Sequence, residues 1–132
     1  MYSKIILVLG LIFCTTLHAH EMTPTYPKLV PSYVDDVYVA KMKIFNRRDD
    51  VEYYEIGVFT KDWKALPFAS SSRIIKVSFS RRKLFEVYIR SVDLPKAVYI
   101  CTESKVYKST KQVTLVSSRI CSKIEQDEWE YY

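Results

Sequence analysis

Residues 37–46 read VYVAKMKIFN, and this run decides the fold. Apolar side chains recur at every second position, with lysines 41 and 43 between them. A period of two is typical of a β-strand that buries one face and exposes the other. The run therefore predicts a strand whose buried face carries Tyr38, Ala40, Met42 and Ile44.

Similar alternating runs follow along the chain and are separated by short polar connections. The further predicted strands cover residues 52–60, 73–79, 85–90, 97–103 and 112–124. An extended segment at 26–30 lies among prolines 24, 27 and 31, so it can only be an edge strand. About seven short strands without an amphipathic helix predict an all-β fold, an immunoglobulin-like sandwich of two antiparallel sheets. A small closed barrel is the alternative.

The first nineteen residues are expected to be a secretory signal peptide. Lys4 precedes an apolar run of about ten residues, and the small residue Ala19 offers a cleavage site. The run is too short to cross a bilayer comfortably. Cys14 is not a good lipid attachment site, because Phe13 stands where a small residue is expected. The sequence therefore predicts a periplasmic or secreted protein that does not span the membrane.

Removal of residues 1–19 leaves one pair of cysteines, Cys101 and Cys121. An oxidising compartment would allow them to form a disulfide. Each lies in one of the last two predicted strands, so the bond would join neighbouring strands. It would close a loop of about twenty residues, which is worth about 3 kcal/mol in the chain-entropy model.

Composition and charge argue against several classes of function. The chain has 20 basic and 15 acidic residues, a mild excess that does not indicate a nucleic-acid partner. His20 is the only histidine after the signal peptide, so no Ser–His or Cys–His nucleophile is available. The two cysteines lack further soft ligands for a metal. We expect no enzyme, no cofactor, no metal and no small-molecule substrate, and we expect His20 to be disordered at the new terminus.

The order of features resembles a known family. The matching segments are Ile44-Phe45-Asn46, residues 53–59, Leu66-Pro67-Phe68, and residues 73–79, 85–90, 94–101 and 118–124. This order is similar to the N-terminal domain of the periplasmic pilus-assembly chaperones, the PapD-like proteins of chaperone–usher systems. The resemblance covers about residues 28–124. It implies a stand-alone domain of this kind at 20–124. The acidic and aromatic residues 125–132 predict a tail that either docks on a basic surface of its own domain or of a partner, or is disordered.

The resemblance also implies a mechanism and a set of binding residues. Members of the family lend their last strand to an unfinished pilus subunit through main-chain hydrogen bonds, and some carry a disulfide between the last two strands. Two basic residues hold the terminal carboxylate of the subunit. The family's last-strand lysine aligns here with Cys121. Arg119 and Lys123 lie two residues to either side on the same strand face, so they are expected to hold the carboxylate in its place. The implied partner-binding residues are Val113, Leu115, Val116, Arg119, Lys123 and Lys28.

We therefore expect an exported protein-binding domain that pairs a sheet edge with an envelope or pilus protein. Two alternatives stay open. One is a secreted binding or inhibitor module that presents loops, for example at Trp63 or at residues 81–83, although we expect Trp63 to be a core residue. The other is a structural subunit of a surface appendage.

Overall fold

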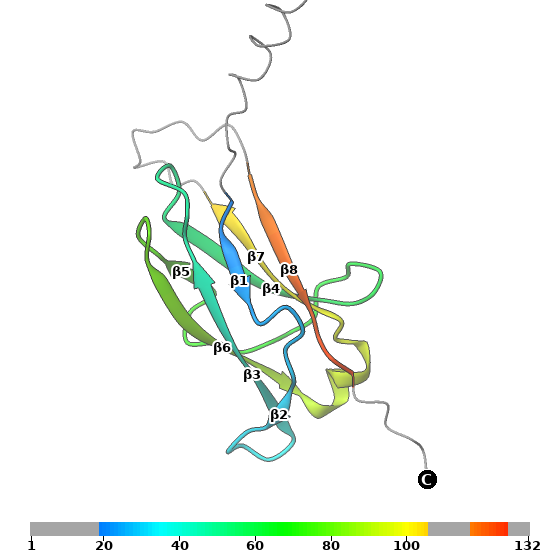
Figure 1. The fold of residues 1–132 in the computed structure, drawn as a ribbon. Coiled ribbons are helices and arrows are strands. Elements are labelled where there is room, and N and C mark those ends of the chain that lie inside the picture. Colours follow the sequence, from blue (N-terminus) through cyan, green and yellow to red (C-terminus); the bar gives the residue numbers. More distant parts are fainter. Residues whose placement is uncertain (1–18, 106–116, 127–132) are drawn as a thin grey trace, which may run out of the picture.

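Two antiparallel sheets pack face to face in the computed structural model, which describes residues 19–105 and 117–126 (Figure 1). In the first sheet, the central strand β3 pairs with β6 on one side and with β1 and β2 on the other. The bounds are β1 (Glu21–Thr23), β2 (Val30–Pro31), β3 (Val37–Phe45) and β6 (Arg82–Arg90). The predicted all-β sandwich of two sheets is confirmed.

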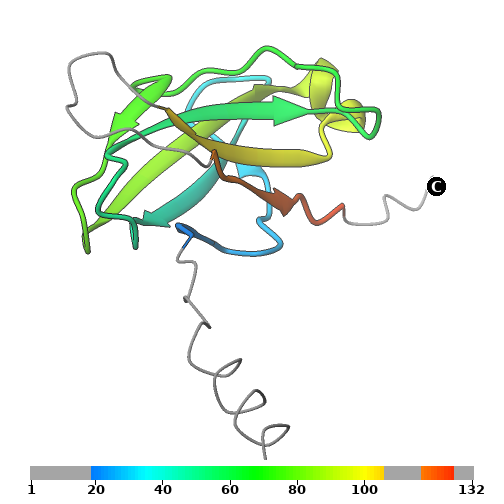
Figure 2. The same ribbon diagram turned by 90° about the horizontal axis from the view of Figure 1, so that it is seen from above.

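The second sheet has the strand order β5-β4-β7-β8 (Figure 2). Its strands are β5 (Ile74–Lys76), β4 (Tyr53–Phe59), β7 (Tyr99–Lys105) and β8 (Arg119–Lys123). A short 3-10 helix, η1 (Ser91–Lys96), connects β6 to β7 where the sequence predicted only a polar connection. No helix in the described part of the chain is long and apolar enough to cross a membrane.

The core lies between the sheets and follows the predicted alternation. On β3, Ala40, Met42 and Ile44 are fully buried as predicted, whereas Tyr38 is only half-buried. Together with the inward residues of β6 in the same sheet, they face inward residues of β4 and β7. These core residues include Ala40, Met42, Ile44, Tyr54, Ile56, Val58, Phe85, Val87, Ile89 and Ile100. A further expected member is missing. The alternation in residues 73–79 predicts a buried face that carries Ile75, Val77 and Phe79, but Phe79 is 56% exposed. The strand ends at Lys76, and the chain turns at Ser80, whose φ is 62°.

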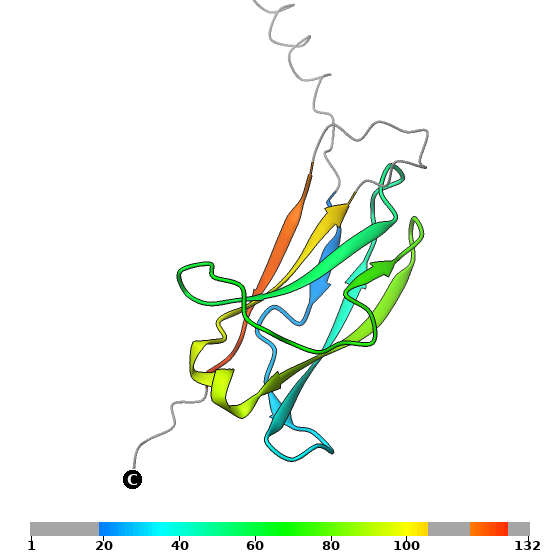
Figure 3. The same cartoon turned by 180° about the vertical axis from the view of Figure 1, so that it is seen from behind.

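Two segments connect the sheets along their sides. After β1 the chain leaves β3, passes beside β8 at residues 25–28 and returns to β3 as β2. On the other side, Ala69 pairs with Tyr88 of β6, and the chain then continues into β5 beside β4 (Figure 3). The segment predicted at 26–30 lies at a sheet edge, although the strand there, β2, covers only Val30–Pro31. Each side segment thus has backbone contacts with both sheets.

Candidate partner-binding edge

The disulfide fixes the last strand to its neighbour. Cys101 and Cys121 stand directly opposite each other in the β7–β8 register, and their sulfurs are 2.02 Å apart. The predicted bond between adjacent strands is confirmed. The ladder and the disulfide thus hold one side of β8 against β7.

Alternate residues of β8 direct their backbone groups to opposite sides. The N–H of Ile124 donates to Val98, and the carbonyl of Ser118 accepts from Ser104, so even-numbered residues bond to β7. Odd-numbered residues then face away from the sheet. These outward residues are Arg119, Cys121, Lys123 and Glu125.

The chain itself covers half of this outward edge. The N–H of Lys123 donates to the carbonyl of Thr25 at 3.1 Å, and that of Glu125 donates to Pro27 at 2.9 Å. A parallel bridge joins Lys28 to Glu125. Part of the outward edge is therefore already paired within the chain. The part without a backbone partner among residues 19–105 and 117–126 is limited to Arg119 and Cys121.

The three basic residues expected to hold a carboxylate are not assembled into one site. Arg119 donates to Glu103 at 2.9 Å, and this hydrogen bond lowers the pKa of Glu103. Its guanidinium also lies 5.3 Å from the centre of the Phe59 ring. Lys28 pairs with Glu125 at 3.7 Å, at the opposite end of β8. Two of the three thus already have carboxylate partners, and only Lys123 has no ion pair within the described ranges.

The apolar residues of the implied donor stripe cannot be placed. Val113, Leu115 and Val116 lie outside the described residues. Their part in partner binding stays a prediction. The structure does describe the two serines that flank this connection, Ser104 at the end of β7 and Ser118 just before β8.

A buried polar cluster lies at this end of the sandwich, and the sequence analysis missed it. His20 is only 1% exposed, which corrects the expectation that it is disordered. Its Nδ1 lies 3.0 Å from the Ser118 hydroxyl and its Nε2 lies 2.9 Å from the Thr102 hydroxyl. The ring also packs at 4.5 Å from the Tyr54 ring. Burial lowers the pKa of His20 to about 4, so the side chain is neutral at pH 7.

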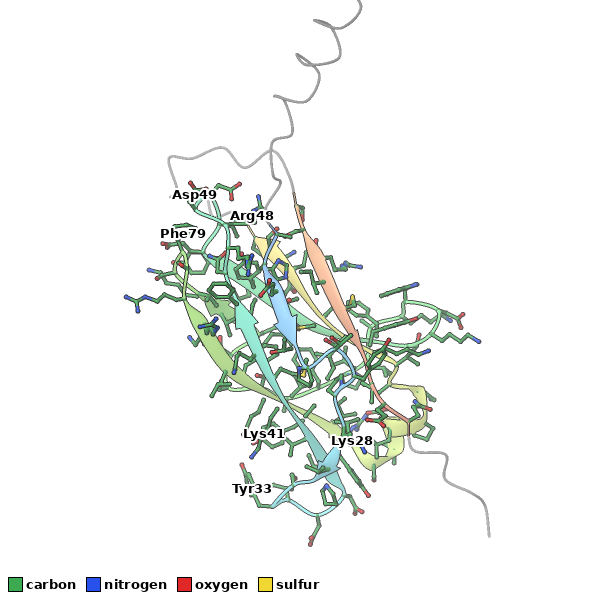
Figure 4. The ribbon with its side chains drawn as sticks, in the orientation of Figure 1. Lys28, Tyr33, Lys41, Arg48, Asp49 and Phe79 are labelled. Atoms are coloured by element: carbon green, nitrogen blue, oxygen red, sulfur yellow. A yellow bond between two sulfur atoms is a disulfide. The ribbon has the colours of Figure 1, made fainter. Side chains whose placement is uncertain are left out.

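Arg48 extends the cluster toward the surface. Its guanidinium binds both carboxylate oxygens of Asp50, at 2.9 and 2.6 Å, which raises the pKa of Arg48 and lowers that of Asp50. The same guanidinium donates to the hydroxyls of Ser118 at 3.3 Å and Ser104 at 3.5 Å. Figure 4 shows Arg48 and Asp49 at the end of the sandwich where β1 begins. The cluster therefore holds the two serines that flank the β7–β8 connection.

Asn46 joins the cluster through hydrogen bonds with Arg48 and Tyr54. Its side-chain amide donates to the carbonyls of Val51 and Val77 at 2.7 and 2.8 Å. Its side-chain oxygen accepts from the Arg48 backbone and from the Tyr54 hydroxyl at 2.6 Å. All the hydrogen-bonding capacity of this buried amide is used, as expected for a structural polar group. Burial raises the pKa of Tyr54 to about 12, so its hydroxyl stays a donor.

A second surface surrounds Trp63. The side chain is 50% exposed and stacks on Tyr99 with ring centres 4.4 Å apart, so the expectation of a core residue is wrong. Next to it, an open groove of about 860 Å³ is lined by aromatic and basic residues. They include Tyr26, Lys61, Lys64, Lys96, Tyr99 and Lys123. None of these four lysines has an ion pair within residues 19–105 and 117–126.

Neither the scan against models of known protein families nor the search of curated proteins found a match for this chain.

Proposed function

We propose that the chain is an exported protein-binding domain that pairs β8 with an extended segment of an envelope or pilus protein, in the manner of the PapD-like chaperones. One observation carries the proposal. The outward backbone groups of Arg119 and Cys121 have no partner among the described residues, on a strand that a disulfide holds in place. Such an edge offers main-chain hydrogen bonds to an added strand.

The covered half of the edge limits where the partner lies. Because Thr25 and Pro27 already accept from Lys123 and Glu125, an added strand pairs with residue 121 and with residues before it. In the sequence, Val113, Leu115 and Val116 precede this stretch, so they extend the same surface in the proposal. The signal peptide and the periplasmic or secreted location belong to the same proposal. The disulfide supports them, because such bonds persist in oxidising compartments.

Replacing Arg119 by proline tests whether the outward backbone of β8 bonds to the partner. Arg119→Pro removes the outward N–H, whereas Arg119→Ala removes the same side chain and keeps that donor. Both variants lose the contact with Glu103. We expect capture of envelope or pilus proteins, identified by mass spectrometry, to be at least tenfold lower for Arg119→Pro than for Arg119→Ala. Thermal melting checks that both variants are folded. Equal capture by the two variants would show that β8 does not pair with the partner.

The surface around Trp63 supports a second candidate function, a module that binds its partner through loops. A half-exposed tryptophan that stacks on a tyrosine is typical of a binding surface, because these two residue types are enriched among those that carry binding energy. On this hypothesis, Trp63→Ala lowers the affinity for the captured protein by at least tenfold, and Trp63→Phe retains most of it because an aromatic ring still stacks on Tyr99. Arg119→Pro then leaves capture unchanged. The two candidate functions thus predict opposite results for the two positions.

A further inference from the structure

Strand β6 offers a second sheet edge, on the opposite side of its sheet from β1 and β2. Tyr88 exchanges two backbone hydrogen bonds with Ala69, at 2.9 and 2.8 Å, so its N–H and carbonyl face away from β3. In an extended strand, Glu86, Leu84 and Arg82 direct their backbone groups to that same side. Beyond Ala69 the chain crosses to β5, as Figures 1 and 3 show. Within the described ranges, the backbone groups of Leu84 and Glu86 have no backbone partner on this side.

The side chains of this open stretch share the outer face of the sheet. Leu84 is 73% exposed, whereas its neighbour Phe85 is buried in the core. The cation Arg82 and the anion Glu86 stand two residues before and two residues after Leu84. Arg82 lies over the Phe45 ring, 4.6 Å from its centre, and Glu86 accepts a hydrogen bond from the Tyr88 hydroxyl. Both charges are therefore held on the outer face.

We propose that the chain forms a two-fold symmetric dimer in which β6 pairs antiparallel with β6 of a second copy. The two-fold axis passes beside Leu84, so this residue stands opposite Leu84 of the second copy. Antiparallel counting then places Arg82 opposite Glu86 of the second copy, and Glu86 opposite its Arg82. Opposite charges on directly facing residues stabilise a strand pair. The edge is thus complementary in charge to itself.

The structure selects this register over its neighbours. The outward N–H and carbonyl of Tyr88 are already bonded to Ala69. The open stretch therefore runs from Arg82 to Glu86, and its middle residue is Leu84. Centring the pair on Arg82 or on Glu86 would place like charges opposite each other, which destabilises a strand pair. Centring it on Phe85 would place Arg82 opposite Tyr88 of the second copy, whose outward groups are taken. Only the register centred on Leu84 uses the whole open stretch.

The apolar surroundings of Leu84 also favour a second copy as occupant. A groove of about 720 Å³ runs beside this residue, and Tyr33, Val34 and Tyr88 contribute to its lining. Natural edge strands are normally protected from pairing by charged side chains, prolines or bulges, or by a segment that covers them. Here the charges have opposite signs and are symmetric about an exposed leucine. They therefore direct the pairing toward an identical edge.

Sedimentation equilibrium on the full chain, with its disulfide intact, tests the dimer. We expect the apparent mass of the wild type to rise to twice the chain mass with concentration. Glu86→Arg and Arg82→Glu each place like charges opposite each other, so the dissociation constant should increase at least tenfold. The double variant, Arg82→Glu with Glu86→Arg, restores both pairs and should return to within about threefold of the wild-type value. Lys105→Glu, a charge reversal on β7 in the other sheet, is the matched control and should leave the constant unchanged.

Three results would overturn the proposal: a wild type that stays monomeric at its solubility limit, single variants that dimerise like the wild type, or a double variant that stays as weak as the singles. Melting curves recorded at a concentration where all variants are monomeric separate loss of folding from loss of pairing. Amide hydrogen exchange locates the interface. Exchange at Leu84 and Glu86 should slow as concentration rises, and slowing at Arg119 and Cys121 instead would assign the dimer to β8.

Discussion

Acidification from pH 7 to pH 4 is expected to lower the free energy of unfolding by about 3 kcal/mol through His20 alone. The pKa of this histidine falls from its ordinary 6.5 to about 4 in the folded protein. Burial is the main cause, and the nearby Arg48 cation adds to it, while the hydrogen bond with Thr102 acts in the opposite direction. Between these two pKa values the unfolded chain binds a proton that the folded chain does not. Stability therefore decreases as the pH falls from about 6.5 to about 4.

Urea unfolding at pH 7, 5.5 and 4 measures this effect. His20→Gln is the control, because glutamine can bond to Thr102 or Ser118 but does not titrate in this range. We expect this variant to be less stable than the wild type at pH 7 and to lose less stability between pH 6.5 and pH 4. Asp50 and Glu103, whose pKa values are lowered, add their own losses as the pH falls below their ordinary range, in both proteins. A wild type and a variant with parallel pH profiles would contradict the burial of His20.

Reduction of the Cys101–Cys121 disulfide is expected to cost about 3 kcal/mol, because the bond closes a loop that restricts the unfolded chain. The separation of the two cysteines is 20 residues. For a domain of this size, that loss is a large share of the total stability. It should appear as a lower urea midpoint when unfolding is measured in the presence of a strong thiol reductant.

Alanine variants separate two contributions of the cysteines to stability: the closure of the loop in the unfolded chain and the packing of their side chains in the folded one. Cys101→Ala with Cys121→Ala should match the reduced wild type to within about 1 kcal/mol, because alanine leaves only a small void. Adding the same reductant to the double alanine variant is the matched control, and it should leave the unfolding of that variant unchanged. If the reduced protein unfolds within about 0.5 kcal/mol of the oxidised one, the loop closure does not stabilise this domain as argued.

The sequence predicted the sheets well because their signal is local. The alternation in residues 37–46 assigns Ala40, Met42 and Ile44 to the inward face of β3 without any knowledge of its neighbours, and the same holds for the inward residues of β4 and β6. The disulfide followed from counting cysteines and from their place in two successive strands. The prediction that Phe79 is buried was wrong, because the strand ends at Lys76 and the chain turns at Ser80, although the apolar alternation continues to residue 79.

The features that define the candidate edges were not predictable in this way. Thr25 and Pro27 cover part of β8 through their backbone carbonyls, and such contacts leave no side-chain pattern. His20 is buried by contacts with Thr102 and Ser118, which lie 82 and 98 residues away in the chain. A histidine next to an expected cleavage site gives no local sign of such distant partners.

The two side segments give the sandwich a mechanical property. Residues 21–31 bond to β3 at both ends and to β8 in between, and residues 69–76 bond first to β6 and then to β4. Each segment is a tie across the seam between the layers. Sliding one layer over the other would break hydrogen bonds along both flanks at once. The two sheets therefore resist sliding past each other. A polypeptide that pulls on the edge strand of one sheet also pulls on the other sheet through these segments.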